Sequence, residues 1–222
     1  MTAIDRDDLR RRWNALWARL RGSPDRAPNL DPLLAAYEEP HRAYHNLRHI
    51  SQMLHEFDAM RDQCDAPDTV ELAIWYHDAV YESTRNDNEE QSAALAGNDL
   101  RTAGLPDETI EAVVDLILAT KHSSAPTTRD ARVLIDIDLS ILGQPAQAFD
   151  EYERGIRREY AHVDEQAFRA GRAAILERFL ARRNIFSTVQ MREKYEASAG
   201  QNIRRSIAQL RGPKPPCRDT GF

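Results

Sequence analysis

Residues 70–82 read VELAIWYHDAVYE, and this stretch decides the fold. Apolar side chains occur on nearly every side of a helix drawn through residues 70–81, which is typical of a helix buried within a protein. His77 and Asp78 interrupt the run at a point where every neighbour is expected to be buried. An ionised carboxylate is costly to bury unless it is paired or binds a metal. The stretch therefore predicts a buried helix that carries a polar site.

Helical periodicity continues on both sides of this stretch. Apolar residues recur every three to four positions and predict further helices at 9–20, after 31–32, from about 44 to 57, and at 86–103, 110–118, 133–142, 149–160, 164–179 and 195–210. VLIDIDL at 133–139 alternates with period two, but aspartates fill its alternate positions, so a strand there is the minor alternative. No repeat or linker divides the helices. The sequence thus predicts an all-α fold in a single domain.

The composition limits the classes of function. Thirty lysines and arginines against 36 aspartates and glutamates give the 222-residue chain a net charge of −6, which argues against binding to polymeric nucleic acid. The longest wholly apolar run, Leu72–Tyr76, is too short to cross a membrane, and the N-terminal MTAIDRDDLRRRW lacks the apolar core of a signal peptide. Cys64 and Cys217 are isolated, so neither a disulfide framework nor a CxxC metal site is expected. These features favour a cytoplasmic protein with no membrane partner.

Three histidines, His41, His45 and His49, follow one another at four-residue intervals. Residues spaced by four share one face of a helix, where two imidazoles can reach one cation. His49 lies at the border of the apolar stripe that begins with Ile50, which makes it the strongest candidate ligand of the three. His41 and His45 have an alternative interpretation as surface or capping residues.

A second apolar segment, VLIDIDLSIL at 133–142, is interrupted by Asp136 and Asp138. One of these aspartates would complete a set of two imidazoles and two carboxylates on three core helices, whose other members are His49, His77 and Asp78. Such a donor set suits a divalent cation of the Mn, Fe, Co, Mg, Ni or Zn group rather than a metal that prefers thiolates. The alternative is a buried His–Asp hydrogen-bond network without a metal.

Three segments in this order resemble the HD superfamily of metal-dependent phosphohydrolases: YHNLRHI at 44–50, WYHDAVYE at 75–82 and IDIDLSILG at 135–143. Within that superfamily the chain is similar to a branch of predicted HD-domain phosphohydrolases, over about residues 40–210. The resemblance implies a helical bundle in which a histidine, a His-Asp pair and a distant aspartate hold the metal. Carried over to this chain, the implied ligands are His49, His77, Asp78 and Asp138.

Asp138 is chosen because, in related sequences, the ligand lies one or two residues ahead of a leucine that packs below it. Asp136 is the alternate ligand, or otherwise a carboxylate that orients one. Some HD proteins hold a second metal with additional histidines between the His-Asp pair and the last aspartate, and here that interval contains only His122. One divalent metal ion is therefore expected.

The resemblance also implies the organisation of the chain. We expect one HD-type helical domain over residues 1–211, with a metal-binding core at about 40–145 and C-terminal helices at about 146–211. Residues 212–222 contain the sequence PKPP and are predicted to be a disordered tail.

The implied activity is the hydrolysis of a small phosphorylated substrate, with a nucleotide as the favoured class. Four residues near the motifs are candidates for proton transfer: Glu82, Glu89, His45 and His122. Glu82 follows Asp78 by one turn of the expected helix, and Glu89 opens the next helix after a short loop. Each candidate has a structural alternative, such as a solvated acid or a side chain that suits the charge of a helix end.

Five residues are candidates for substrate binding, because arginine and lysine suit phosphate and tyrosine can stack on a base: Tyr44, Arg48, Lys121, Arg157 and Arg172. Each also has a structural alternative. Lys121 suits the end of its helix, the two C-terminal arginines can pair with neighbouring glutamates on a solvated face, and Tyr44 can simply pack.

Two rival classes of function remain open at this point. A non-catalytic HD module would keep the fold and bind a metal and a nucleotide for regulation. A di-iron oxygenase on the same fold would need the additional histidines that this chain lacks. A metal-dependent phosphohydrolase is the favoured interpretation.

Overall fold

The computed structural model describes residues 5–20 and 26–212, and within these residues the chain is all-helical, with no strand. The prediction of an all-α fold is confirmed. The α-helices are α1 (Arg6–Arg19), α2 (Leu30–Ala36), α3 (Leu47–Met60), α4 (Pro67–Tyr76), α5 (Asn88–Thr102), α6 (Asp107–Ala119), α7 (Arg129–Asp138), α8 (Ala146–Glu159), α9 (Glu165–Leu180) and α10 (Val189–Arg211). Two short 3-10 helices, η2 (Arg61–Gln63) and η3 (Leu139–Gly143), follow α3 and α7. Except for its first residue, the predicted tail lies outside the described residues.

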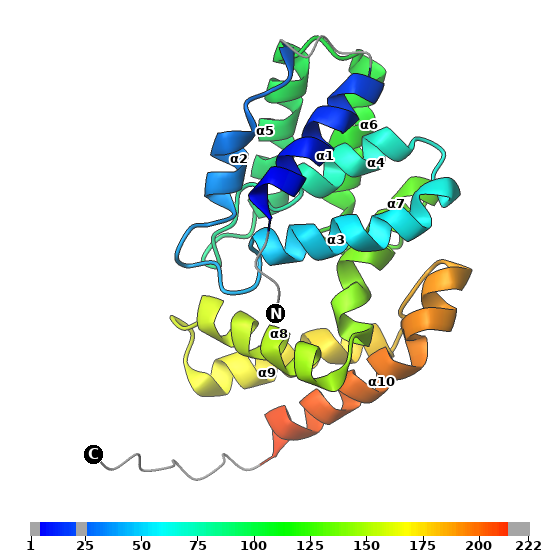
Figure 1. Cartoon of the computed structure of the whole chain (residues 1–222). Helices are drawn as coiled ribbons and strands as arrows, with labels where there is room; N and C mark the ends of the chain where they lie inside the picture. Colours follow the sequence, from blue (N-terminus) through cyan, green and yellow to red (C-terminus); the bar gives the residue numbers. More distant parts are fainter. Residues whose placement is uncertain (1–4, 21–25, 213–222) are drawn as a thin grey trace.

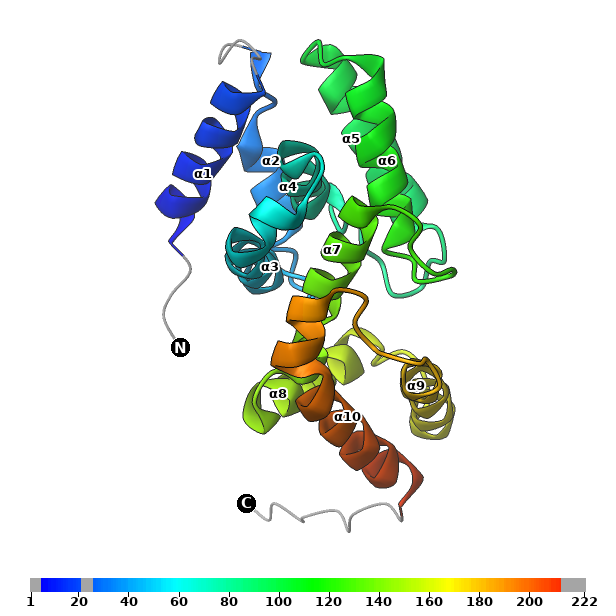
Figure 2. The same ribbon diagram turned by 90° about the vertical axis from the view of Figure 1, so that its right-hand side faces the viewer.

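The helices form two groups that meet at α7. Helices α1 to α6 lie on one side, and α8, α9 and α10 lie together at the other end of the molecule, with α7 running between the groups (Figures 1 and 2). η3 continues from α7 and packs against α8 and α10. Side chains from the end of α7 therefore face both groups.

Helix α4 is buried on all sides, as its apolar sequence predicts. Every residue from Thr69 to Tyr76 is buried. Glu71 lies among them with only 1% of its surface exposed, and its carboxylate accepts hydrogen bonds from Arg12, Arg19 and Arg61. Such pairing satisfies a buried carboxylate, so the charge of Glu71 has a structural explanation in the contact between α1 and α4.

Helix α4 ends before His77 rather than continuing to residue 81, and local hydrogen bonds explain why. In a continuing helix the backbone N–H of Asp78 would donate to the carbonyl of Ile74. Instead, the His77 Nδ1 donates to that carbonyl at 3.0 Å, and the Asp78 N–H donates to the Tyr37 hydroxyl at 3.2 Å. The buried guanidinium of Arg42 then holds the turn by donating to the carbonyl of Asp78 at 2.6 Å.

Helix α3 begins later than predicted. Its first residue is Leu47 rather than a residue near Tyr44, because the side chain of Asn46 caps the helix by accepting from the Arg48 N–H at 2.9 Å. His45 therefore precedes the helix, and the three histidines spaced by four do not share one helix face. Helix α2, which the sequence predicted after residues 31–32, begins at Leu30 because Asn29 caps it.

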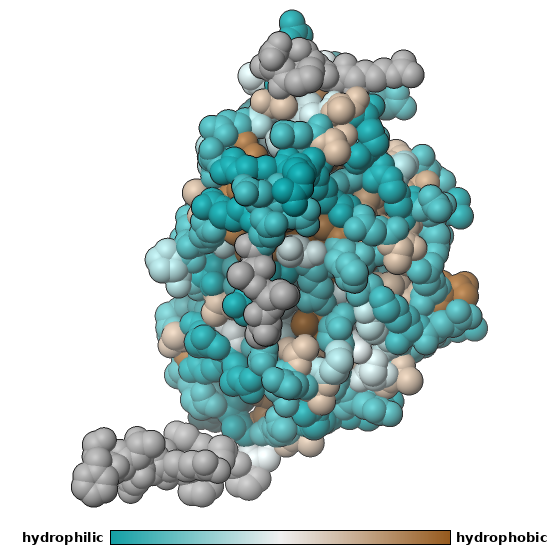
Figure 3. Space-filling model, in the orientation of Figure 1, coloured by the Kyte–Doolittle hydropathy of each residue, from teal (hydrophilic) through white to brown (hydrophobic). Residues whose placement is uncertain are grey.

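The visible surface is mainly hydrophilic, with small separate hydrophobic patches (Figure 3). Among residues 5–20 and 26–212, no helix combines the length and the apolar character needed to cross a membrane.

Candidate metal centre

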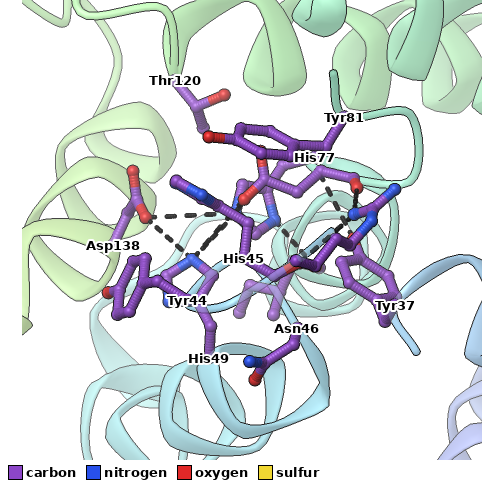
Figure 4. Close-up of polar contacts among 12 residues, drawn as sticks. Tyr37, Tyr44, His45, Asn46, His49, His77, Tyr81, Thr120 and Asp138 are labelled. Carbon is purple, nitrogen blue, oxygen red and sulfur yellow. Dashed lines mark hydrogen bonds and ion pairs between the residues drawn. The ribbon is translucent and has the colours of Figure 1, made fainter. Parts of the chain in front are cut away.

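Three helices bring a buried His-His-Asp group together. His49 lies in the first turn of α3, His77 follows the last residue of α4, and Asp138 is the last residue of α7. The side chains point toward one another in Figure 4. The Nε2 atom of His49 lies 3.2 Å from Nε2 of His77 and 3.2 Å from Oδ1 of Asp138, and the three ligand atoms all lie within 4.8 Å of one another. This group can hold a metal ion.

The spacing of these atoms fits a divalent cation. Ligands about 2.1 Å from a cation lie about 3 Å apart when they are neighbours and about 4.2 Å apart when they are opposite. The third distance in the group, from His77 Nε2 to Asp138 Oδ1, is 3.9 Å, so all the separations fall within this range. Both histidines are almost fully buried, which matches the desolvated environment in which metal ligands are usually held.

The ring orientation of His77 also suits a ligand. A carbonyl only accepts hydrogen bonds, so the contact with Ile74 means that the Nδ1 of His77 carries a proton. A neutral imidazole protonated at Nδ1 presents its Nε2 lone pair, and a backbone carbonyl is a common partner of metal-binding histidines. The same hydrogen bond that ends α4 therefore aims the His77 lone pair at the centre.

Asp78 lies beside the group as a fourth candidate ligand and its second carboxylate. Its Oδ2 is 3.0 Å from Nε2 of His77 and 3.7 Å from Nε2 of His49, although Asp78 is not among the three residues whose ligand atoms all lie within 4.8 Å. Burial acts to raise the pKa of Asp78, but the charges of His77 and His45 outweigh it and lower the pKa below its usual range. Asp78 is therefore ionised and available to a cation.

Asp136 is placed away from the centre, contrary to its role as the alternate ligand. It is fully buried, and its two oxygens accept the backbone N–H groups of Ser187 at 2.7 Å and Thr188 at 2.6 Å. Residues two apart on a helix point about 200° apart, so Asp136 faces the start of α10 while Asp138 faces the centre. Burial raises the pKa of Asp136. Asp136, the first carboxylate of the DID segment, thus positions the start of α10 rather than a ligand of the centre.

His122 contacts the second oxygen of Asp138. Its Nε2 lies 3.1 Å from Oδ2 of Asp138, and its Nδ1 is buried without a hydrogen-bond partner. The backbone of His122 has a φ of 53°, in the left-handed region that costs a non-glycine residue about 1 kcal/mol. The sequence predicted His122 as a proton-transfer residue; in the structure it contacts Asp138, a candidate ligand, and is placed to orient that carboxylate.

His45 lines the pocket and is held there by Glu159, a partner that the sequence did not suggest. The buried carboxylate of Glu159, on α8, accepts from the His45 Nδ1 at 2.7 Å and from the Tyr81 hydroxyl at 2.9 Å, and the His45 ring stacks on Tyr81. Burial acts to lower the pKa of His45, but the charges of Asp78 and Glu159 outweigh it and raise the pKa. More than 110 residues separate Glu159 from His45, so no local spacing signals this pair.

The two predicted acids, Glu82 and Glu89, differ in position. Because α4 ends early, Glu82 does not follow Asp78 by a helical turn; its side chain is 54% exposed and lies 3.8 Å from Nε2 of His41. Glu89, in the first turn of α5, lines the pocket beside the centre, whereas Glu82 does not. The geometric reason for choosing Glu82 is therefore wrong.

A pocket of about 960 Å³ opens onto this centre between the two groups of helices. His77, Asp78 and Asp138 form part of its lining. Aromatic side chains form much of its wall: Tyr44, Tyr81, Tyr152, Tyr160, Phe168 and Phe179. The pocket can therefore accept a small molecule with both a charged part and a flat apolar part.

The five predicted substrate-binding residues separate into two sets. Tyr44, Lys121 and Arg172 line the pocket. Arg48 is exposed and is not part of the lining. Arg157 is also outside the lining, because it holds the turn between α8 and α9 by donating to the backbone carbonyls of residues 160 and 163 and to the Glu165 carboxylate.

Comparison with known proteins gave no relatives: no family model matches the chain, and no match was found among curated proteins or solved structures. The function therefore has to be inferred from the residues of the site.

Proposed function

We propose that the protein is a metal-dependent phosphohydrolase that acts on a small phosphorylated substrate, with a nucleotide as the favoured class. One observation carries the proposal: the ligand atoms of His49, His77 and Asp138 converge at a pocket large enough for a nucleotide. The resemblance of the three sequence segments to HD phosphohydrolases supports the same activity, with Asp78 as the fourth ligand and one metal ion per chain.

The residues around the centre supply what phosphate hydrolysis requires. A bound divalent cation polarises a phosphoryl oxygen and lowers the pKa of water. Glu159 accepts from the Nδ1 of His45, which leaves the Nε2 of His45 to accept or donate a proton, and Glu89 provides an acidic side chain at the same pocket. The aromatic wall offers stacking surfaces for a base. Glu82 is set aside as the proton-transfer residue because its side chain lies outside the pocket.

The alternative is a non-catalytic module that binds a metal and a nucleotide and has a regulatory role. In such a module, His49, His77 and Asp138 would bind the metal in the same way. The two functions differ in whether a bound phosphate ester is cleaved, and the His45–Glu159 pair beside the centre favours the enzyme, because a binding module has no need of a proton-transfer group.

The experiment is a screen of nucleotides and sugar phosphates with the full chain loaded with Mn, Mg, Co or Ni. We expect phosphate release that depends on the added metal, and loss of bound metal in His49→Gln. His55→Gln is the matched control, because His55 lies on the same helix and is exposed. Binding of nucleotides by the metal-loaded protein without any hydrolysis would refute the enzyme and favour the regulatory module.

A further inference from the structure

Among the described residues, five cationic side chains line the pocket: Arg85, Lys121, Arg172, Arg178 and Arg182. Three of the five already have carboxylate partners. Arg85 pairs with an aspartate two residues away at 2.7 Å, Lys121 pairs with Glu90, and the buried Arg172 pairs with Glu153. Their positive charges are largely neutralised within the protein.

Arg178 and Arg182 differ from the other three. Neither has a hydrogen bond or ion pair to an acidic side chain among the described residues, and the guanidinium of Arg182 instead stacks over the Phe179 ring at 4.7 Å. Glu177, the acid next to Arg178, is taken by Arg211. Burial and the nearby charge of Arg178 both lower the pKa of Arg182, and the charge of Asp136, which forms no ion pair with it, opposes them without restoring the usual value.

The two arginines lie close to the metal centre but are not part of it. Arg178 lies in the last turn of α9 and Arg182 lies two residues beyond its end, and both line the same pocket. The ring of Phe179 contacts Arg182 on one side and the imidazole of His122 on the other, with a centroid distance of 6.1 Å to His122. His122 in turn contacts Asp138. One aromatic ring and one imidazole therefore lie between Arg182 and the candidate ligand group.

We infer that Arg178 and Arg182 form a second anion-binding subsite, so that the substrate carries two phosphate groups, one at the metal centre and one at these arginines. The inference rests on the proposed function. Arginine binds phosphate through paired N–H groups, and an arginine pair without an internal acid has its donors available for a ligand. The flat apolar wall between the two subsites suits the nucleoside that would join the phosphates.

The test compares nucleoside monophosphates with nucleosides that carry two phosphates, using the Mn-loaded full chain. For the double variant Arg178→Gln/Arg182→Gln we expect KM for the two-phosphate compounds to rise about 10- to 100-fold, the usual worth of charged hydrogen bonds, with little change for monophosphates. Arg183→Gln removes the same charge outside the pocket lining and should change neither value. Equal losses on both substrate classes, or no loss on either, would overturn the inference.

Calorimetry with a nucleoside 3′,5′-bisphosphate and the matching 5′-monophosphate separates this inference from the proposed function. If the protein hydrolyses nothing but binds the bisphosphate more tightly than the monophosphate, and the double variant loses that preference, the subsite stands and the enzyme proposal fails. If monophosphates are hydrolysed and the double variant matches the wild type on every ligand, the enzyme stands and the subsite fails.

Discussion

At the scale of single residues, His77 is the most constrained member of the centre. Its Nδ1 is fixed on a backbone carbonyl, while its Nε2 faces two carboxylates, Asp78 and Asp138. Burial acts to lower the pKa of His77, but these carboxylates outweigh it and raise the pKa to about 9. At neutral pH the metal-free protein therefore holds a proton where a cation is expected to bind.

This leads to a prediction about pH. A metal must displace the His77 proton, so metal affinity should rise about tenfold per pH unit up to the His77 pKa of about 9 and level off above it. Titration calorimetry with Mn²⁺ at pH 7, in buffers of different ionisation enthalpy, should report close to one proton released per ion. Binding that is independent of pH between 6 and 8 would contradict this assignment.

Glu159 provides a second prediction at this scale. Its carboxylate accepts four hydrogen bonds, from the backbone N–H groups of Tyr44 and His45, the His45 ring and the Tyr81 hydroxyl. An amide cannot accept all four, so Glu159→Gln should lower the free energy of unfolding by about 1–3 kcal/mol. Glu151→Gln, on the same helix with one hydrogen bond to Gln147, should change it little, as chemical denaturation would measure.

The stability from Glu159 should also depend on pH. Hydrogen bonds from His45 and from the two backbone N–H groups, together with the His45 charge, outweigh burial and lower the pKa of Glu159 in the folded protein. A lowered folded-state pKa gives stability that is present above the unfolded value, near pH 4.5, and lost as the pH falls through the folded value. Glu159→Gln should therefore be less sensitive to acid in this range than the wild type.

At the scale of elements, the two aspartates of the DID segment separate metal binding from helix positioning. Asp136→Asn should reduce stability by about 1–3 kcal/mol, because an amide nitrogen would face one of the two N–H donors at the start of α10. The folded variant should still bind one metal ion. Asp138→Asn, by contrast, should lose the bound metal. Metal analysis of the two purified variants distinguishes them, and metal loss in Asp136→Asn alone would restore Asp136 as the ligand.

Two glycines, one packed between helices and one with open space around it, give a further matched pair of variants. A Cβ at Gly143 would lie 2.8 Å from the Tyr195 ring, so Gly143→Ala forces η3 away from α10 and should cost about 1–3 kcal/mol. A Cβ at Gly171, inside α9, meets nothing within 4 Å. Gly171→Ala should therefore stabilise the protein by about 0.5–1 kcal/mol, the gain in helix propensity. Thermal denaturation of both variants measures the difference.

The elements also show which parts of the fold can be predicted from sequence. The apolar period identifies each helix because it reflects the face that is buried. The apolar period does not predict the start of α3 or the end of α4, because both depend on individual side chains. Asn46 caps the start of α3, and Tyr37 and His77 form the hydrogen bonds that end α4. A one-turn error at the end of α4 was enough to misplace Glu82.

The candidate site was predictable for a related reason. Charged residues inside apolar segments stand out in the sequence, and this pattern marks His77, Asp78 and the pair Asp136 and Asp138, whereas the choice of Asp138 over Asp136 comes from the resemblance to HD proteins. Glu159 lies on the partly exposed amphipathic helix α8, where a glutamate gives no such signal. Its role follows only from the packing of α8 against the segment before α3, which local spacing does not encode.

At the scale of the whole molecule, the site joins helices that are distant in sequence. The ligand group draws on α3, the end of α4 and α7, and the pocket wall adds α8 and α9. A metal that binds the folded chain and not the unfolded chain stabilises the folded state by mass action. Metal binding should therefore stabilise the packing of α7 against α3 and the end of α4.

The last prediction follows from this linkage. With Mn²⁺ at about 100 times its Kd, the folded protein should gain about 2.7 kcal/mol over the chelated protein, and its Tm should rise accordingly. The metal-free protein should remain folded, because protonated His77 already compensates the buried carboxylates. His49→Gln should fold but lose the Mn-dependent rise in Tm, while His55→Gln on the same helix keeps it. Equal Tm values for wild type in Mn²⁺ and in excess chelator would show that the His-His-Asp group is a hydrogen-bond network and not a metal site.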